Sequence, residues 1–283
     1  MRTHKILLFL ILGIILINFY IYSIIFYDNE NLVVYFLDIG QGDSTLIRSP
    51  SGRIILIDGG DGSTIMNKLS QVLPFGVRDI DLVIATHPDK DHINGLIPVF
   101  DKFNVPNFLY SNIEKDSDIY KSLLDKVRKE GSTIFIAKRG QVFDLGGGAY
   151  LEILFPDRLV SEVESNTGSI VSRIVYRDNE FLITGDSPQS IEKYLVYLDG
   201  DTLSSDVLKL GHHGSKTSSS KIFLEKVRPS FGVLSYGKDN KYGHPNKEPL
   251  DFMADLSINP VSTAGGGSIV FYADGSNLIF EQK

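Results

Sequence analysis

The sequence predicts an α/β fold in which two sheets pack together between outer helices, an αββα sandwich, preceded by one apolar helix. Two observations predict the sandwich: strand-like and helix-like segments interleave, and many of the strand-like segments follow one another as hairpins. No linker rich in Pro or Ser and no internal repeat divides the chain. We therefore expect a cytoplasmic N-terminus (1–5), a transmembrane anchor (6–27) and one folded domain (28–283).

Short apolar runs bounded by turn residues predict the strands, and apolar residues at helical spacing predict the helices. Glycines between the first strands permit the positive φ angles that tight turns need. Strands are expected at 32–38, 44–48, 53–57, 81–85, 133–137, 141–145, 150–155, 170–176, 181–184, 206–210, 231–235, 268–272 and 277–280. Helices are expected at 62–74, 93–100, 118–129 and 188–198.

The N-terminal segment has the pattern of a membrane anchor. Residues 6–27 contain no charged residue and follow Arg2 and Lys5. A bilayer core needs about 20 apolar residues in a helix, whereas the core of a signal peptide has about 7–15. Positive charges on the short side predict an N-terminus inside and the folded domain outside the membrane. A cleaved signal peptide is the alternative.

Composition excludes several classes of function. The apolar fraction of 42% and the charged fraction of 22% are typical of a folded globular protein. The net charge of -7 argues against a strongly basic nucleic-acid binder. The chain has no cysteine, so disulfides, thiolate metal sites and cysteine nucleophiles are excluded.

Four side chains that can bind metals crowd into six positions after the expected strand 81–85. They are His87, Asp89, Asp91 and His92. The two carboxylates would repel each other unless a cation lay nearby. A loop can turn such side chains toward one point, whereas neighbours in a strand face opposite sides. Four ligands on so short a segment suit two ions about 3.5–4 Å apart better than one ion.

Two further strand ends carry side chains of the same kind. Asp186 follows the strand 181–184, and His212 and His213 follow the strand 206–210. Taken separately, Asp186 also suits a helix N-cap, and the two histidines also suit a glycine-flanked turn. Because three strand ends point to one edge of a sheet, a shared metal site is the better interpretation.

Seven segments between Phe36 and Pro245 carry a resemblance to a known family: FLDIGQGDS, ILIDGGDGS, ATHPDKDHINGL, NTGSIV, FLITGD, DVLKLGHHGSKTSS and NKYGHP. In these segments the chain resembles the metallo-β-lactamase fold family of hydrolases, and within it the extracytoplasmic domain of ComEC-type DNA-uptake proteins. The resemblance implies the metallo-β-lactamase form of the αββα sandwich. One anchor stands where that family has a polytopic channel, so a role in DNA import does not follow.

The resemblance implies a centre for two divalent metal ions, Zn²⁺ or Mn²⁺. All expected ligands are His or Asp side chains at strand ends: His87, Asp89, Asp91, His92, Asp186, His212 and His213. The first two would hold one ion, Asp91 and His92 the other, and Asp186 would bridge them.

One of His212 and His213 would complete the second site, and His212 is favoured because it directly follows the strand and a glycine. Asp58 would lie behind the ligands and orient their loop. Asp89 and Asn166 stand where the superfamily usually has histidines. The first site is therefore expected to be rich in oxygen ligands, which suits Mn²⁺ as well as Zn²⁺.

Catalytic roles are expected for Asp91, His244, Asn166 and Ser169. Asp91 would act as a metal ligand, whereas Asn166, Ser169 and the segment 215–220 would donate to the non-bridging oxygens of a phosphodiester. His244 would protonate the leaving oxygen, although a turn histidine is the alternative.

The sequence thus predicts a membrane-anchored extracytoplasmic hydrolase that uses two metal ions to cleave a phosphodiester, with DNA as a candidate substrate. No obligate protein partner is inferred. The alternatives are hydrolysis of a cell-wall polymer or choline phosphate, hydrolysis of a lactam, lactone or thioester, and a metal-dependent binding domain without turnover. Asp89 and Asn166 make the lactam, lactone and thioester readings less favoured.

Overall fold

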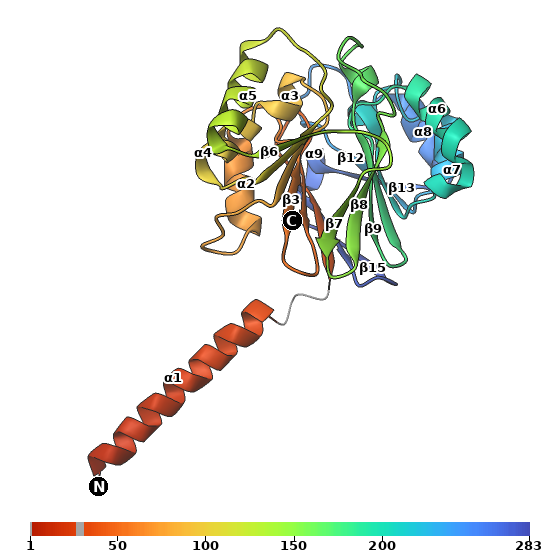
Figure 1. Cartoon of the computed structure of the whole chain (residues 1–283). Coiled ribbons are helices and arrows are strands. Elements are labelled where there is room, and N and C mark those ends of the chain that lie inside the picture. Colours follow the sequence, from red (N-terminus) through yellow and green to blue (C-terminus); the bar gives the residue numbers. More distant parts are fainter. Residues whose placement is uncertain (1, 27–30) are drawn as a thin grey trace.

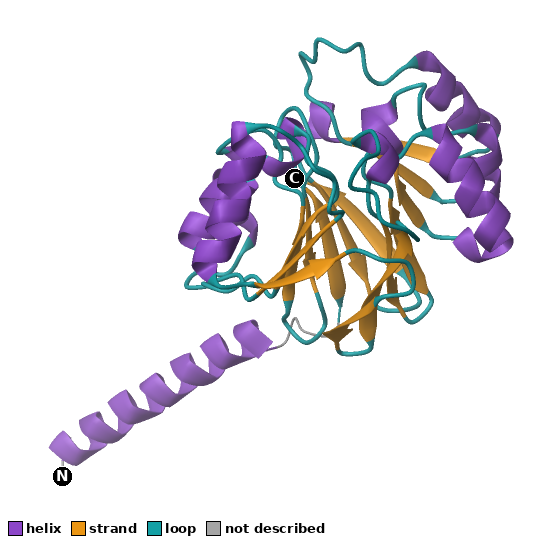
Figure 2. Cartoon of the chain, turned by 45° about the horizontal axis from the view of Figure 1, so that its top comes forward, coloured by secondary structure: helices purple, strands orange, loops and turns teal. Residues whose placement is uncertain are grey.

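The computed structural model describes residues 2–26 and 31–283, and two sheets packed face to face form its centre (Figures 1 and 2). The first sheet has the strand order β15 (Leu278–Gln282), β14 (Ile269–Ala273), β1 (Leu32–Phe36), β2 (Thr45–Arg48), β3 (Ile54–Ile57), β4 (Leu82–Ala85), β5 (Asn107–Tyr110) and β6 (Thr133–Ile136). The second sheet has the order β13 (Asn259–Ser262), β12 (Phe231–Leu234), β11 (Val207–Lys209), β10 (Asn179–Ile183), β9 (Val171–Tyr176), β8 (Ala149–Phe155) and β7 (Val142–Gly146).

Helices cover both outer faces, which confirms the αββα sandwich (Figure 2). The first sheet is covered by α2 (Thr64–Val72), α3 (Lys90–Ile93), α4 (Leu96–Lys102) and α5 (Asp118–Glu130). The second is covered by α6 (Gln189–Asp199), α7 (Lys221–Val227) and α8 (Lys247–Asp255). The short helix α9 (Thr263–Gly266) precedes β14, and 3₁₀ turns occupy Asn166–Gly168, Gly200–Leu203 and Gly211–Gly214.

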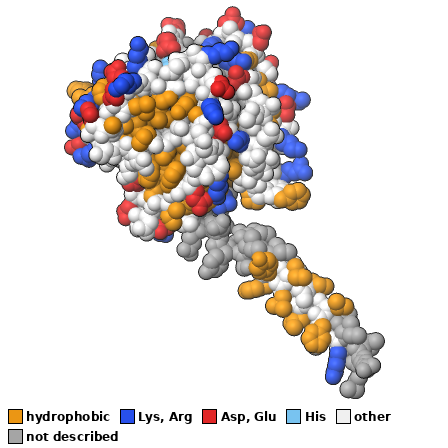
Figure 3. Space-filling view, turned by 180° about the vertical axis from the view of Figure 1, so that it is seen from behind, with side chains coloured by type: hydrophobic (Ala, Val, Ile, Leu, Met, Phe, Trp, Pro, Cys, Tyr) orange, Lys and Arg blue, Asp and Glu red, His pale blue; other side chains and the backbone are white. Residues whose placement is uncertain are grey.

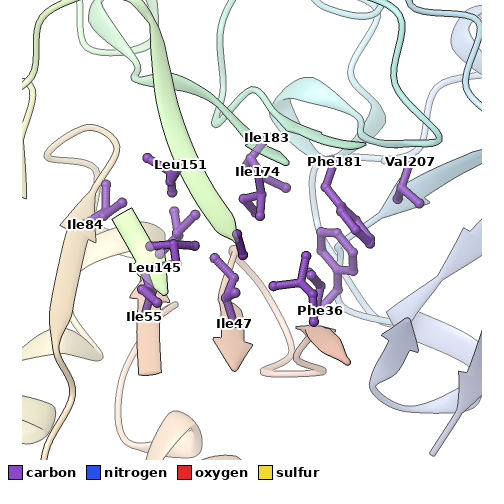
Figure 4. Packing of buried hydrophobic residues seen from close by; sticks show 14 of the residues in the cluster. Phe36, Ile47, Ile55, Ile84, Leu145, Leu151, Ile174, Phe181, Ile183 and Val207 are labelled. Carbon is purple, nitrogen blue, oxygen red and sulfur yellow. The ribbon is translucent and has the colours of Figure 1, made fainter. Parts of the chain in front are cut away.

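Apolar side chains fill the space between the sheets. Phe36 and Phe181, both labelled in Figure 4, belong to one buried cluster. Each packs edge-on against Phe271, with ring centroids 6.1 and 6.0 Å apart. Ile84 and Ile174 belong to the same buried cluster. Because the other faces of the sheets pack on helices, the central strands are buried on both sides and appear in the sequence as continuous apolar runs.

Parallel strands in both sheets end at the edge where the candidate site lies. In the first sheet, β3, β4, β5 and β6 run parallel, and in the second β10, β11, β12 and β13 do so. Residues that follow these strands therefore emerge at common edges. This arrangement brings together segments that lie more than 100 residues apart, from Asp58 to His213.

The sequence did not predict β5, α7, α8, β13, the short α9 or the 3₁₀ turns. The two strands have only four residues each, and Pro260 within β13 is unusual for a strand. Pro249 in α8 weakens the helical pattern, although it lies in the first turn, where a helix tolerates proline. The predicted helix 93–100 is corrected to two helices, α3 and α4, because the chain passes Gly95 between them.

The N-terminal helix α1 (Arg2–Phe26) stands apart from the sheets (Figure 1). Described side chains such as Phe9 and Phe19 are exposed, and Figure 3 shows apolar groups along the helix. Within the part of the chain that is described, no helix has the length and apolarity that spanning a membrane requires. The structure therefore does not support the transmembrane anchor predicted at 6–27, whose last residue lies outside the described ranges.

Candidate metal centre

The segment after β4 directs two histidines into the interior. His87 is 1% exposed, and α3 carries Asp91 together with the fully buried His92. The amides of His92 and Ile93 both donate to the carbonyl of Asp89, at 3.0 Å, which closes the helical turn. The imidazole centroids of His87 and His92 lie 4.0 Å apart. The predicted loop is thus corrected in part to a helical turn, whose backbone hydrogen bonds fix the directions of Asp91 and His92.

Asp186 lies where the other candidate ligands converge. Its Oδ2 atom is 3.4 Å from Nε2 of His92, 3.7 Å from Nε2 of His213 and 3.9 Å from Nε2 of His87. Gly185, with φ of 52°, makes the turn after β10 that directs this carboxylate inward. Nε2 of His212 lies 3.9 Å from the same Oδ2 atom, so four imidazole nitrogens surround this carboxylate, which makes it a candidate ligand of any ion held here.

His213 and His212 have different environments. Both have left-handed backbone conformations, with φ of 57° and 49°, so their side chains diverge. His213 is 2% exposed, and its Nδ1 donates to the carbonyl of Ser235 at 2.9 Å. In the neutral ring this hydrogen bond leaves the lone pair on Nε2, which lies 3.4 Å from Oδ2 of Asp91. The side chain of His212 is 30% exposed, and its Nδ1 meets the hydroxyl of Thr217 at 3.1 Å. This geometry favours His213 for the second site, whereas the sequence pattern favoured His212.

Asp58 holds His92 from behind. Its carboxylate accepts hydrogen bonds from the amide of Thr86 at 2.8 Å and from the hydroxyl of Thr86 at 2.7 Å. Its Oδ2 atom also lies 2.8 Å from Nδ1 of His92. With Nδ1 occupied, Nε2 of His92 faces Asp186. Asp58 therefore has the position expected of a residue that orients a metal ligand.

Ser169 lies in the interior, between Asp186 and His87. It is fully buried, its hydroxyl accepts the amide of Asp186 at 3.1 Å, and it meets Nδ1 of His87 at 3.0 Å. The hydroxyl of Thr86, which donates to Asp58, lies 3.1 Å from the same nitrogen. Ser169 was expected to donate to the substrate; its burial and these contacts instead place it between two candidate ligands, which it would orient.

Asp89 lies at the margin of the centre. One oxygen contacts the hydroxyl of Ser165 and accepts from the ammonium of Lys115 at 2.7 Å. The other oxygen is 4.0 Å from Nε2 of His87. Burial opposes ionisation of Asp89, but His87 and Lys115 outweigh it and lower its pKa. Oδ1 of Asn166 is buried and has no hydrogen-bond partner among the described residues, so it remains a candidate ligand for the first site.

Sequence reasoning missed a buried ion pair behind the centre. The ammonium of Lys209, 1% exposed, contacts the carboxylate of Asp43, 5% exposed. Asp43 also lies 3.3 Å from Nδ1 of His213, and Lys209 lies 3.9 Å from Oδ1 of Asp186. Both residues belong to segments that carried the resemblance, but a lysine in an apolar strand gives no signal of its partner.

The charges of the centre shift the pKa values of its histidines. Burial lowers the pKa of His87 to about 4, with help from neighbouring His92. Burial alone would lower the pKa of His92, but Asp186 and Asp58 raise it well above its usual value. In the same way, burial is outweighed at His213, where Asp186 and Asp43 raise the pKa to about 9. The carboxylates thus favour the protonated forms of His92 and His213, whereas burial favours the neutral form of His87.

The donor set fits divalent metal ions. The Nε2 atoms of His87, His92 and His213 are buried and make no hydrogen bond to any described residue. Oδ1 of Asp186 is likewise buried and makes no hydrogen bond to a described residue. A buried imidazole nitrogen or carboxylate without a partner is costly, and a cation shared between such groups removes the cost. The nitrogen and oxygen donors suit Zn²⁺, Mn²⁺ or Fe²⁺.

The predicted substrate contacts of segment 215–220 are corrected in part. Ser218, Ser219 and Ser220 are buried, and the amide of Ser220 donates to the carboxylate of Glu192 at 2.7 Å. These serines anchor the segment instead of facing a substrate. Lys216 and Thr217 are exposed beside the centre.

His244 lies close to His212, with ring centroids 5.5 Å apart, and 6.3 Å from the ring of His213. Its Nδ1 is buried and, within the described ranges, without a hydrogen-bond partner. Burial, together with His212 and His213, lowers its pKa. The ring of His244 thus lies next to the candidate centre. Its role in proton transfer stays a prediction.

Comparisons with known proteins agree with this geometry. Residues 37–238 match the sequence pattern of the metallo-beta-lactamase superfamily. The chain is 27% identical to ComE operon protein 3 of Bacillus subtilis, over 83% of this chain and 32% of that protein. It is 32% identical to competence protein ComA of Neisseria gonorrhoeae, over 86% and 32% of the two chains. The chain thus spans about a third of the length of these curated relatives.

Solved structures show the same fold. Igni18, a metallo hydrolase from Ignicoccus hospitalis, superposes with a TM-score of 0.55 at 16% identity, over 84% of this chain and 98% of that chain. CmlA, a diiron β-hydroxylase from Streptomyces venezuelae, gives a TM-score of 0.56 at 14% identity, over 84% and 53%. At such identities the likeness concerns the fold alone.

Proposed function

Because the chain belongs to the metallo-β-lactamase superfamily, we propose that it is a metal-dependent hydrolase that holds two divalent ions and cleaves phosphodiesters, with DNA as its substrate. One observation carries the proposal. Three buried imidazole nitrogens, which have no hydrogen-bond partner among residues 2–26 and 31–283, converge on Oδ2 of Asp186. The superfamily supports a metal-dependent hydrolase, whereas the number of ions and the phosphodiester substrate are the proposed part.

The ligands divide into two groups around Asp186. His87, Asp89 and Asn166 would hold the first ion, and Asp91, His92 and His213 the second. Divalent ions in such sites supply a water nucleophile at neutral pH and stabilise negative charge on oxygen.

The chain's own residues supply orientation and protons. Asp58 and Ser169 hold His92 and His87 with their Nε2 atoms inward. His244, beside the centre, would donate a proton to the leaving alcohol oxygen as the phosphorus–oxygen bond breaks.

Two features favour a phosphodiester over a lactam. Asp89 and Asn166 offer oxygen where the superfamily's usual pattern has imidazole nitrogen, and hard oxygen donors suit ions that handle phosphate esters. In addition, two curated relatives have names that refer to competence and recombination, which are processes of DNA.

The test uses the full chain, loaded with Mn²⁺ or Zn²⁺ in turn, against bis-p-nitrophenyl phosphate, single-stranded DNA and the β-lactam nitrocefin. We expect turnover of both phosphodiesters and little turnover of nitrocefin. Nitrocefin as the preferred substrate would refute the phosphodiester assignment. Binding of two ions without turnover of any substrate would leave a metal-binding domain and refute an enzyme.

We also propose that residues 6–27 tether the folded domain to the outer face of the cytoplasmic membrane. The support is the uncharged sequence of this segment after Arg2 and Lys5. Protease added to spheroplasts that produce the chain should digest the domain while a cytoplasmic marker stays intact. Recovery of the intact chain in the soluble fraction of lysed cells would contradict the tether.

A further inference from the structure

An aromatic column leads from the candidate centre to the surface. The ring of His244 lies 5.5 Å from that of His212, and Tyr242 stacks on the outer side of His244 at 6.0 Å with an interplanar angle of 14°. Tyr242 is 67% exposed. A large aromatic ring at this position has one face on His244, and the other remains available to a flat ligand.

The loop that carries Tyr242 is held in place. The side chain of Asn240 donates to the carbonyls of Gly237 and His244, at 3.0 and 2.8 Å, and accepts the amide of His244 at 3.0 Å. Asn246 accepts the amide of Lys216 at 2.8 Å, which joins this loop to the segment after the histidine turn. The column is therefore preorganised, and a ligand need not order it.

Three lysines lie on the two segments that adjoin the column: Lys238 and Lys241 on the loop of Tyr242, and Lys216 after the histidine turn, which Asn246 joins to that loop. Lys216, Lys238 and Lys241 are exposed, and none of them forms an ion pair with a described residue. Other lysines near the centre are paired, as Lys115 is with Asp89 at 2.7 Å. In a chain of net charge -7, three unpaired cations at the mouth of one site form a local attraction for an anion.

We propose that this rim, formed by Lys216, Lys238, Lys241 and Tyr242, binds single-stranded nucleic acid beside the cleaved phosphodiester. A base stacks on the free face of Tyr242, and the lysines contact the flanking phosphates. The inference rests on the proposed phosphodiesterase function and adds to it a preference for single strands and the residues that hold them. An exposed ring selects single strands, because the bases of a duplex are stacked on each other. A phosphate polymer without bases gains nothing from Tyr242.

Binding is measured by fluorescence anisotropy on the full Mn²⁺-loaded chain. The probes are a fluorescein-labelled 12-mer of thymidine and an abasic 12-mer, both with phosphorothioate linkages that resist cleavage. Tyr242→Ala should weaken binding of the thymidine probe by about tenfold and leave the abasic probe unchanged. Tyr242→Phe should retain wild-type binding.

The lysines are tested together. The triple variant Lys216→Gln, Lys238→Gln, Lys241→Gln should weaken both probes and reduce the slope of log K against log salt by about 2. The matched control changes three exposed lysines elsewhere, Lys102, Lys129 and Lys138, to Gln and should leave the slope nearly unchanged. Tyr197→Ala, on α6 and 83% exposed, is the control for the lost ring.

The outcomes separate this proposal from the proposed function. No binding of the thymidine probe by the wild type, or equal loss in the rim and control variants, would overturn the rim. So would a polyglycerol phosphate competitor that displaces the thymidine probe as well as unlabelled thymidine 12-mer does. Failure of the proposed function would instead appear as absent turnover of bis-p-nitrophenyl phosphate by the wild type.

Discussion

Oδ2 of Asp186 lies 3.4 Å from Nε2 of His92, although the two residues come from different sheets and are 94 positions apart. Asp186 follows β10 and His92 lies in α3, after β4. The pair is therefore created only when the two sheets pack face to face. The candidate centre exists because of the sandwich, and the predictions below test its parts.

His213 and His212 should differ in their effect on metal binding. His213→Gln removes a buried Nε2 next to Asp91 and Asp186, so the second ion should be lost at micromolar metal. His212→Gln changes a half-exposed ring and should keep two ions. Isothermal titration with Zn²⁺ of the two variants gives the comparison. The reverse result would restore His212 as the ligand.

Asp58→Asn should reduce metal affinity by about 10–100-fold, as expected when a group behind a ligand is changed. The amide cannot accept the same three hydrogen bonds from Thr86 and His92, and its NH₂ group would face a donor. Competition with a chelator of known affinity measures the change. An affinity equal to wild type would show that Asp58 does not orient His92.

Gly42→Ala should destabilise the fold and disturb Asp91. Gly42 has φ of 103°, and an added Cβ would lie 1.9 Å from the carbonyl oxygen of Asp91. Strain and the clash together should lower the free energy of unfolding by about 2 kcal/mol or more. Gly40→Ala is the control: φ is 82° but the space is open, so strain alone should cost about 1–2 kcal/mol. Urea unfolding that ranks the two variants equally would contradict the close packing.

Glu192 should make stability fall as pH rises. Burial raises its pKa from 4.5 to about 7, although the amides of Ser220 and Ser219 favour the charged form. Between these values the folded chain binds more protons than the unfolded chain, so the free energy of unfolding decreases with pH. Glu192→Gln removes this proton, and its stability relative to wild type should increase from pH 5 to pH 8. Parallel curves for wild type and variant would refute the raised pKa.

The fold was largely predictable, because buried strands give continuous apolar runs that turn residues interrupt. The resemblance to ComEC-type proteins is confirmed by the superfamily match and the competence relatives. The segments that form the candidate centre also attract attention in the sequence, since His and Asp side chains directly after strands are unusual; their role as ligands stays a prediction. What the pattern missed are short elements such as β5, which has four residues and no alternation of its own.

The finer details of the centre depend on tertiary structure. The choice between His212 and His213 depends on left-handed backbone angles, which two adjacent histidines do not reveal. The pair of Lys209 and Asp43 joins strand ends from different sheets, so neither residue indicates the other in the sequence. The hydroxyl of Ser169 could donate to a substrate on sequence grounds, and its burial beside His87 and Asp186 becomes visible only in the folded chain.

The central claim is that Asp186 joins two metal ions, and the most direct test is the number of ions per chain. Equilibrium dialysis of the full chain against Mn²⁺ or Zn²⁺, followed by elemental analysis, should give two ions in the wild type. Asp186→Ala, folded as judged by circular dichroism, should retain at most one weakly bound ion. One ion or none in the wild type at saturating metal, or two ions in Asp186→Ala, would contradict the account.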